Sequence, residues 1–176
     1  MLLALVVLLL ALVVGWAGGG RLWALGQLEL RSRRLVVAAV VVQAAGAVAG
    51  GSAYPAGLAA SALLVGAFLV RNRGVRGTGL VALGLVSNAV VVGLNGAMPV
   101  SGDAAGRAGV STQAIVSGED ARHSLAGPTT RLLPLGDVIP VLLPLHPEVV
   151  SPGDVLVMAG LGQLVTAGMW AARRRG

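Results

Sequence analysis

The stretch Leu94-Asn95-Gly96-Ala97-Met98-Pro99-Val100 ends an apolar run and opens residues 96–150, the one long segment that is unsuited to lipid. Seven of the eight prolines, six of the seven acidic residues and both histidines lie between Pro99 and Asp154. The rest of the chain consists of apolar runs joined by arginine-rich turns. We therefore expect the polar segment to form a cap on a bundle of apolar helices.

The composition is that of a membrane protein. Hydrophobic residues make up 56% of the 176 residues and charged residues only 11%, whereas soluble domains average roughly 45–50% and about 25%. The apolar residues also come in unbroken blocks, as in transmembrane helices. These features predict an integral membrane protein bound to the lipid bilayer.

The apolar runs predict an all-α fold, a polytopic membrane helix bundle with about five transmembrane helices and a Pro-rich extracytoplasmic cap segment. Residues 1–176 would form a single domain. A cleaved signal peptide is the alternative for the first run, but no basic residue precedes Arg21 to form its positive region. The expected spans are residues 2–18, 35–53, 55–70, 78–95 and 154–172, with residues 96–150 as the extracytoplasmic segment.

The arginines predict the orientation. All 13 basic residues are arginine, and ten of them lie in residues 21–34, 71–77 and 173–176. The positive-inside rule then places the N-terminus outside and the C-terminus inside the cytoplasmic membrane of a bacterium. Residues 21–34 are either a short cytoplasmic connector or a contact with anionic lipid or a partner. A nucleic-acid partner is not expected, because only 3% of residues are aromatic and the arginines flank apolar runs.

Local signals predict how several helices begin, end and meet. Gly96 after Asn95 favours a left-handed helix cap, and Ser151-Pro152-Gly153-Asp154 fits a helix start with Ser151 as N-cap. Asn88 fits an interhelical hydrogen bond, and the pair Gly46 and Gly50 fits close helix packing. Residues 117–120, Ser-Gly-Glu-Asp, predict a further helix, which Gly127-Pro128 would end.

Three motifs also carry a family resemblance. They are Asn95-Gly96-Ala97-Met98-Pro99-Val100, Leu135-Gly136-Asp137-Val138-Ile139-Pro140 and Ser151-Pro152-Gly153-Asp154. Together they resemble the signature of an uncharacterised family of bacterial multi-pass membrane proteins, a domain of unknown function, whose members often carry a second glycine where this chain has Ala97. The resemblance implies a cluster of these motifs outside the membrane and implies no activity.

A ligand site is a hypothesis for this cluster. Asn95 and Asp154 end spans at one membrane face and Asp137 lies between them, so the three side chains can meet, with Arg131 and His123 as further candidates. Asp137 could instead be structural, accepting backbone N–H groups or pairing with Arg131 or Arg122. No catalytic residue, metal site or cofactor is predicted, because cysteine is absent and no metalloprotease or nucleophile spacing occurs.

The sequence favours a non-enzymatic membrane protein whose outer cap binds a partner or lipid, as a homo-oligomer or as a subunit of a membrane complex. The alternative is a small-molecule or lipid transporter, or a membrane enzyme, with a site under the cap. An ion-coupled pump is disfavoured, because residues 35–70 and 78–95 contain no Asp, Glu, His, Lys or Arg. A polar cavity shared by Asn95, Asp137 and Asp154 would favour the alternative.

Overall fold

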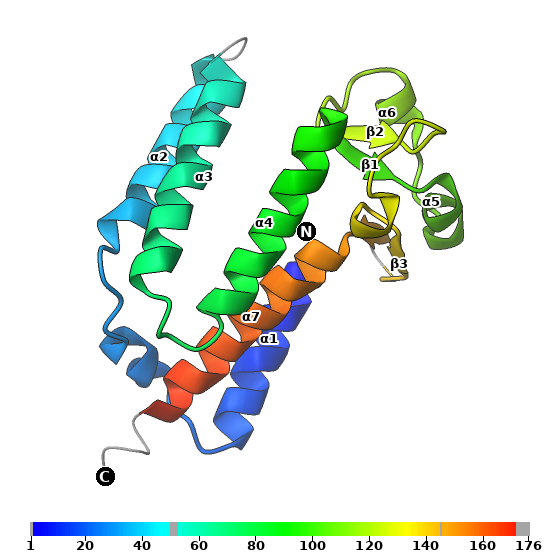
Figure 1. The fold of residues 1–176 in the computed structure, drawn as a ribbon. Coiled ribbons are helices and arrows are strands. Elements are labelled where there is room, and N and C mark those ends of the chain that lie inside the picture. Colours follow the sequence, from blue (N-terminus) through cyan, green and yellow to red (C-terminus); the bar gives the residue numbers. More distant parts are fainter. Residues whose placement is uncertain (1, 50–52, 145, 172–176) are drawn as a thin grey trace.

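The chain is mostly helical in the computed structural model, which describes residues 2–49, 53–144 and 146–171 (Figure 1). The five long helices are α1 (Leu2–Ala17), α2 (Arg34–Ala49), α3 (Ala53–Arg71), α4 (Thr78–Asn95) and α7 (Pro152–Trp170). The shorter helices are η1 (Leu22–Gln27), α5 (Gly102–Ala108), α6 (Gln113–Val116) and η2 (Leu133–Leu135). The strands are β1 (Met98–Val100), β2 (His123–Leu125), β3 (Ile139–Val141) and β4 (Glu148–Val150).

The long helices occupy the five apolar runs, but the prediction of an all-α fold was wrong in the cap. Strands β1 and β2 pair in parallel, and β3 and β4 pair antiparallel, each as a two-stranded sheet. The predicted helix from Ser117 is also absent. Ser117 is the C-cap of α6, Gly118 takes a left-handed φ of 79°, and β2 follows.

The long helices form two groups. Helices α4, α7 and α1 lie side by side, whereas α2 and α3 pack mainly on each other and diverge from α4 (Figure 1). The cap lies where α4 ends and α7 begins, so both ends of residues 96–150 are held by the same helix pair. The predicted cap is therefore built on α4 and α7.

Glycines let the backbones of α4 and α7 touch. A Cβ atom on Gly84 would lie 2.3 Å from the carbonyl oxygen of Gly153, and one on Gly160 would lie 2.6 Å from the carbonyl oxygen of Gly77. Small residues at such crossings allow close van der Waals contact between helices. The α4–α7 contact therefore depends on two glycine pairs, one at the start of α7 and one near its middle.

The other helices are tied to this pair by similar contacts. The indole Nε1 of Trp170 donates to the carbonyl of Gly15 at 3.0 Å, which joins the ends of α7 and α1. In the second group, a Cβ on Gly46 would lie 3.1 Å from the Cα of Gly57, so this glycine does mediate the close packing of α2 and α3. Its predicted partner Gly50 lies outside the described residues.

Among the described residues, α4 is the single helix that is long and apolar enough to cross a membrane by length and composition. Shorter apolar helical stretches cover Leu2–Ala17, Arg34–Gly46 and Ala59–Arg71. The arginines at 173–175, which contribute to the predicted orientation, lie outside the described residues. The five predicted spans thus correspond to helices in position, and their insertion in a bilayer is a proposal argued below.

The glycine contact can be tested by adding one methyl group. Gly84→Ala should destabilise the protein by about 1–3 kcal/mol, because the new Cβ overlaps the backbone of α7. Gly93→Ala on the same helix is the matched control, since a Cβ there meets nothing within 4 Å, and it should stabilise by about 0.5–1 kcal/mol. Thermal denaturation of the purified variants measures both effects, and shifts of equal sign and size would contradict the contact.

Candidate functional site

The candidate site is a polar cluster at the junction of the cap with α4 and α7, here called the junction cluster. Its members are Asn88, Asp120, His123, Asp137, Ser151 and Asp154. The three sequence motifs meet around it, as the resemblance implied, and their backbone contacts explain how.

The first two motifs pair through their backbones. Gly96 caps α4 in the predicted left-handed conformation, with φ 81°, and β1 follows directly. The backbone N–H of Asp137 donates to the carbonyl of Pro99 at 2.9 Å, and that of Ser101 donates to the carbonyl of Asp137 at 2.9 Å. Gly136 is required here, since a Cβ would lie 2.6 Å from the Pro99 carbonyl oxygen. Asp137 is thereby fixed beside β1.

The parallel pairing of β1 with β2 places His123 next to Asp137. Met98 of β1 is in register with His123, and Val100 forms an isolated bridge with Asp137. The His123 Nε2 lies 3.6 Å from Asp137 Oδ2, and His123 Nδ1 lies 2.8 Å from Asp120 Oδ2. The imidazole therefore lies between two carboxylates.

The third motif forms the expected helix start. The Ser151 hydroxyl accepts the Asp154 N–H at 3.0 Å, and the Asp154 carboxylate accepts the Ser151 N–H at 3.0 Å. This reciprocal capping box satisfies two N–H groups at the start of α7. The prediction of Ser151 as N-cap is confirmed.

Asn88 of α4 joins this cap across the helix contact. Its Nδ2 donates to Asp154 Oδ1 at 2.8 Å, and its Oδ1 accepts the Ser151 hydroxyl at 3.0 Å. A Cβ on Gly153 would lie 1.9 Å from Asn88 Oδ1, so the glycine of the motif leaves room for the amide. The predicted interhelical role of Asn88 is confirmed, and it bridges α4 to both polar residues of the α7 cap.

The electrostatics of the cluster centre on Asp137, which is only 5% exposed. Burial and the neighbouring charge of Asp154 raise the pKa of Asp137 to about 6, with His123 acting in the opposite direction. For Asp120, partial burial acts to raise the pKa, but hydrogen bonds from His123 and the Arg122 backbone hold it below the usual value. The two carboxylates beside His123 therefore differ in their affinity for protons.

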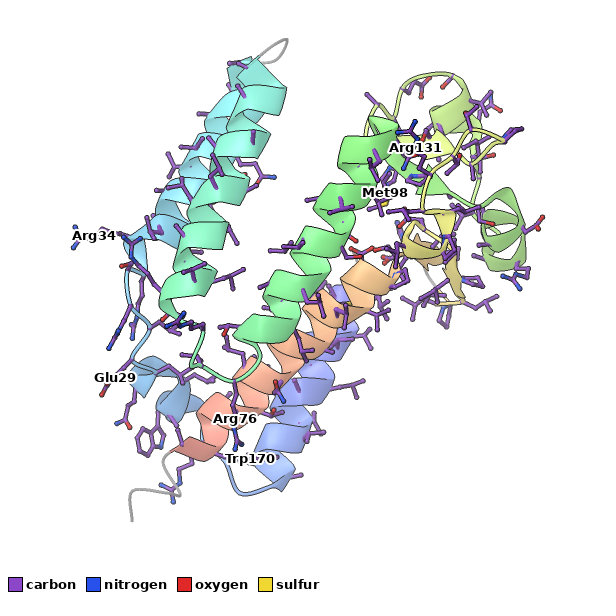
Figure 2. The ribbon with its side chains drawn as sticks, viewed as in Figure 1. Glu29, Arg34, Arg76, Met98, Arg131 and Trp170 are labelled. Atoms are coloured by element: carbon purple, nitrogen blue, oxygen red, sulfur yellow. The ribbon has the colours of Figure 1, made fainter. Side chains whose placement is uncertain are left out.

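The predicted site residues do not all meet. Asp137, Asp154 and His123 belong to the junction cluster, whereas Asn95 is engaged elsewhere. The Asn95 side chain donates to the Arg131 carbonyl at 2.9 Å and accepts the Arg131 N–H at 2.8 Å. This pair ties the loop before η2 to the end of α4, and the Arg131 side chain is exposed (Figure 2).

One alternative for Asp137, an ion pair with Arg131 or Arg122, is not found among the described residues. The neighbour of its carboxylate is His123, and Arg122 instead lies 3.4 Å from Asp120. Asp120 was missed as a site residue, although its spacing of three residues from His123 was a usable signal. Within the described residues, no group of three or more His, Cys, Asp or Glu side chains is arranged to hold a metal ion.

The raised pKa of Asp137 predicts a pH-dependent stability. The folded protein binds this proton more tightly than the unfolded chain, whose carboxyl has the usual pKa of 3.8. The stabilisation is complete below the unfolded pKa and is lost as the pH rises through about 6. The difference between the folded and unfolded pKa values of Asp137 corresponds to about 3 kcal/mol of stability. Asp137→Asn removes the titration, so its stability relative to the natural protein should increase from pH 4 to pH 7.5.

Melting temperatures across this pH range measure the difference. Glu119→Gln is the control, because Glu119 is an exposed acid of the same cap, and its difference from the natural protein should stay constant. Melting curves of Asp137→Asn that run parallel to those of the natural protein would show that Asp137 titrates as it does in the unfolded chain.

Comparison with known proteins identifies a family. Residues 27–166, most of the chain, match a family of unknown function, DUF5317. The chain belongs to this family, as the resemblance of its motifs to a domain of unknown function suggested. No curated protein and no solved structure matches it.

Proposed function

We propose that this member of the DUF5317 family is an integral bacterial membrane protein of five spans, with a cap on the outer side that binds a partner or lipid. The observation that carries the proposal is the exposure of large apolar side chains along the long helices. Val48 is 90% exposed, Leu63 77% and Leu9 61%. Soluble proteins rarely leave extended apolar surface uncovered, and a bilayer would cover it.

The lengths and charges of the helices support insertion. Helix α4, with 18 residues, is about 27 Å long at about 1.5 Å per residue, close to the roughly 30 Å of a bilayer core. Helices α1 and α2 are shorter, with 16 residues each, and bilayer thinning or flanking residues would compensate. The charged residues of the described long helices lie at helix ends: Arg34, Arg71 and Asp154.

The distribution of charge supports the orientation with the N-terminus outside. The junction cluster and most acids lie in the cap, whereas Arg76 and Glu29 lie at the opposite end of the molecule from Arg131 (Figure 2). Arginines are concentrated in the two connectors at that opposite end. Under the positive-inside rule that end faces the cytoplasm.

Single cysteines test this topology, because the chain has no cysteine of its own. Ser117 in the cap and Gln27 at the end of η1 are both exposed. In intact cells, an impermeant thiol reagent should label Ser117→Cys and leave Gln27→Cys unlabelled, while permeabilised cells should label both. Labelling of Gln27→Cys alone in intact cells would reverse the orientation, and recovery of the protein in the soluble fraction would refute insertion.

Two features support a binding role for the cap: its surface exposes apolar side chains, and the polar groups of the junction cluster are used in hydrogen bonds with one another. Leu142 after β3 is 73% exposed, and Val116 at the end of α6 is also exposed. The polar groups of Asn88, Ser151 and Asp154 bond to one another. These features favour an apolar contact made by the cap surface, in a homo-oligomer or a larger membrane complex.

The second candidate is a small-molecule or lipid transporter, or a membrane enzyme, with its site at the junction cluster. A buried carboxyl with a raised pKa beside a histidine favours it, because such groups often mark functional sites. In this case Asp137, His123 and Asp154 would bind the substrate or a proton beneath the cap.

Two variants separate the candidates. Leu142→Asn should release protein or lipid that co-purifies in mild detergent and should fail to complement a deletion strain, because it puts a polar group into an apolar contact. If the cap surface carries the function, Asp137→Asn should keep the co-purifying protein or lipid and should still complement the deletion strain. Loss of complementation by Asp137→Asn alone, at normal expression, would favour the second candidate, and Glu119→Gln controls for loss of charge in the cap.

A further inference from the structure

A second polar site lies at the end of the molecule opposite the cap. The connector before α2 and the turn after α3 enclose an open hollow of about 800 Å³. Its polar lining comes from Glu29, Arg31, Ser32, Arg71, Asn72 and Arg73. The two sides of the hollow, residues 29–32 and 70–75, lie some 40 positions apart in the chain, so the hollow exists only in the folded protein.

Asn72 holds the two sides of this hollow together. It is 3% exposed, and its side chain accepts the Arg31 N–H at 2.8 Å and donates to the Arg31 carbonyl at 2.9 Å. The Thr78 hydroxyl donates to the Asn72 carbonyl at 3.0 Å, which links the turn to the start of α4. Ser32, which follows Arg31 and has a left-handed φ of 57°, turns the chain beside these hydrogen bonds. The positions of the neighbouring arginines are thereby set by buried hydrogen bonds.

The charge of the hollow suits a phosphate group. Arg31, Arg71 and Arg73 bring three positive charges against the single negative charge of Glu29. A guanidinium presents several N–H donors in a planar fork, which matches the oxygens of a phosphate and gives strong charge-assisted hydrogen bonds. The side chains of Arg31, Arg71 and Arg73 are exposed, so a ligand in the hollow can reach their guanidinium groups.

We propose that this hollow binds a phosphate group, held by Arg31, Arg71 and Arg73 and supplied by the headgroup of an anionic lipid. The choice of a lipid source rests on the proposed membrane insertion, which places the start of α2 and the end of α3 at the level of the inner headgroups. The phosphate chemistry does not depend on insertion. A soluble phosphate is the other possible source.

The test compares ligands and arginines in the full chain. Native mass spectrometry in neutral detergent measures binding of phosphatidylglycerol, with zwitterionic phosphatidylcholine, whose phosphate is offset by the choline cation, as the reference of zero net charge. Calorimetry measures binding of inorganic phosphate. Arg73→Gln should weaken phosphatidylglycerol binding roughly tenfold by removing a charged hydrogen-bonding partner. The matched control is Arg76→Gln, because Arg76 lies on the same turn but faces Leu28 and Trp170 instead of the hollow. It should change the affinity less than about twofold.

Asn72→Ala is an independent test, since it removes the side-chain hydrogen bonds to the Arg31 backbone while all arginines remain. It should weaken binding several-fold, with folding checked by circular dichroism, whereas diffuse attraction to surface charge would be unaffected. Saturable binding of inorganic phosphate without lipid, lost in Arg73→Gln, would support the phosphate site and assign it to a soluble ligand. Equal losses in Arg73→Gln and Arg76→Gln, or no saturable binding of either probe, would overturn the site without bearing on the topology.

Discussion

The close approach of α4 and α7 is the contact on which the rest of the structure depends. Gly84 faces Gly153 and Gly77 faces Gly160, so the two backbones touch near both ends of the contact. Asn88 then reaches the Ser151 and Asp154 side chains across a gap that only a glycine at 153 leaves open. One helix leads into the cap and the other leads out of it. Their separation therefore determines where the first and last residues of the cap can lie, and with them the strands that bring Asp137 to its place.

This arrangement explains why two acids lie so near each other at the junction. Asp154 is needed at the third position of α7, where it completes the capping box and meets the positive end of the helix dipole. Asp137 has no such set of donors, and burial together with the charge of Asp154 makes its proton hard to remove. The nearby His123 offsets part of this effect. The proton affinity of Asp137 thus follows from a helix cap that serves the stability of α7.

The sequence predicted features that depend on local chemistry or on long apolar runs. The long helices, the left-handed Gly96 and the Ser151 cap are of this kind, because neighbouring residues determine them. The strands were missed because each has three residues and β1 pairs with a strand more than 20 positions away. Ser117 to Asp120 has the composition of a helix start, but Gly118 turns the chain into β2. Strand β2 brings His123 to Asp137, so the neighbour of Asp137 could not be predicted without knowing that β1 pairs with β2.

The two ends of the molecule use polar side chains in different ways, and this difference bears on what each end can bind. At the cap, Asn88, Ser151 and Asp154 satisfy one another, so the junction offers an external ligand few unused groups beyond Asp137 and His123. At the opposite end, the buried amide of Asn72 bonds only to backbone groups and leaves the arginine heads exposed around the hollow. Exposed guanidinium groups on a backbone held by buried hydrogen bonds suit capture of a charged headgroup. An apolar partner is better matched by the exposed leucine and valine side chains of the cap.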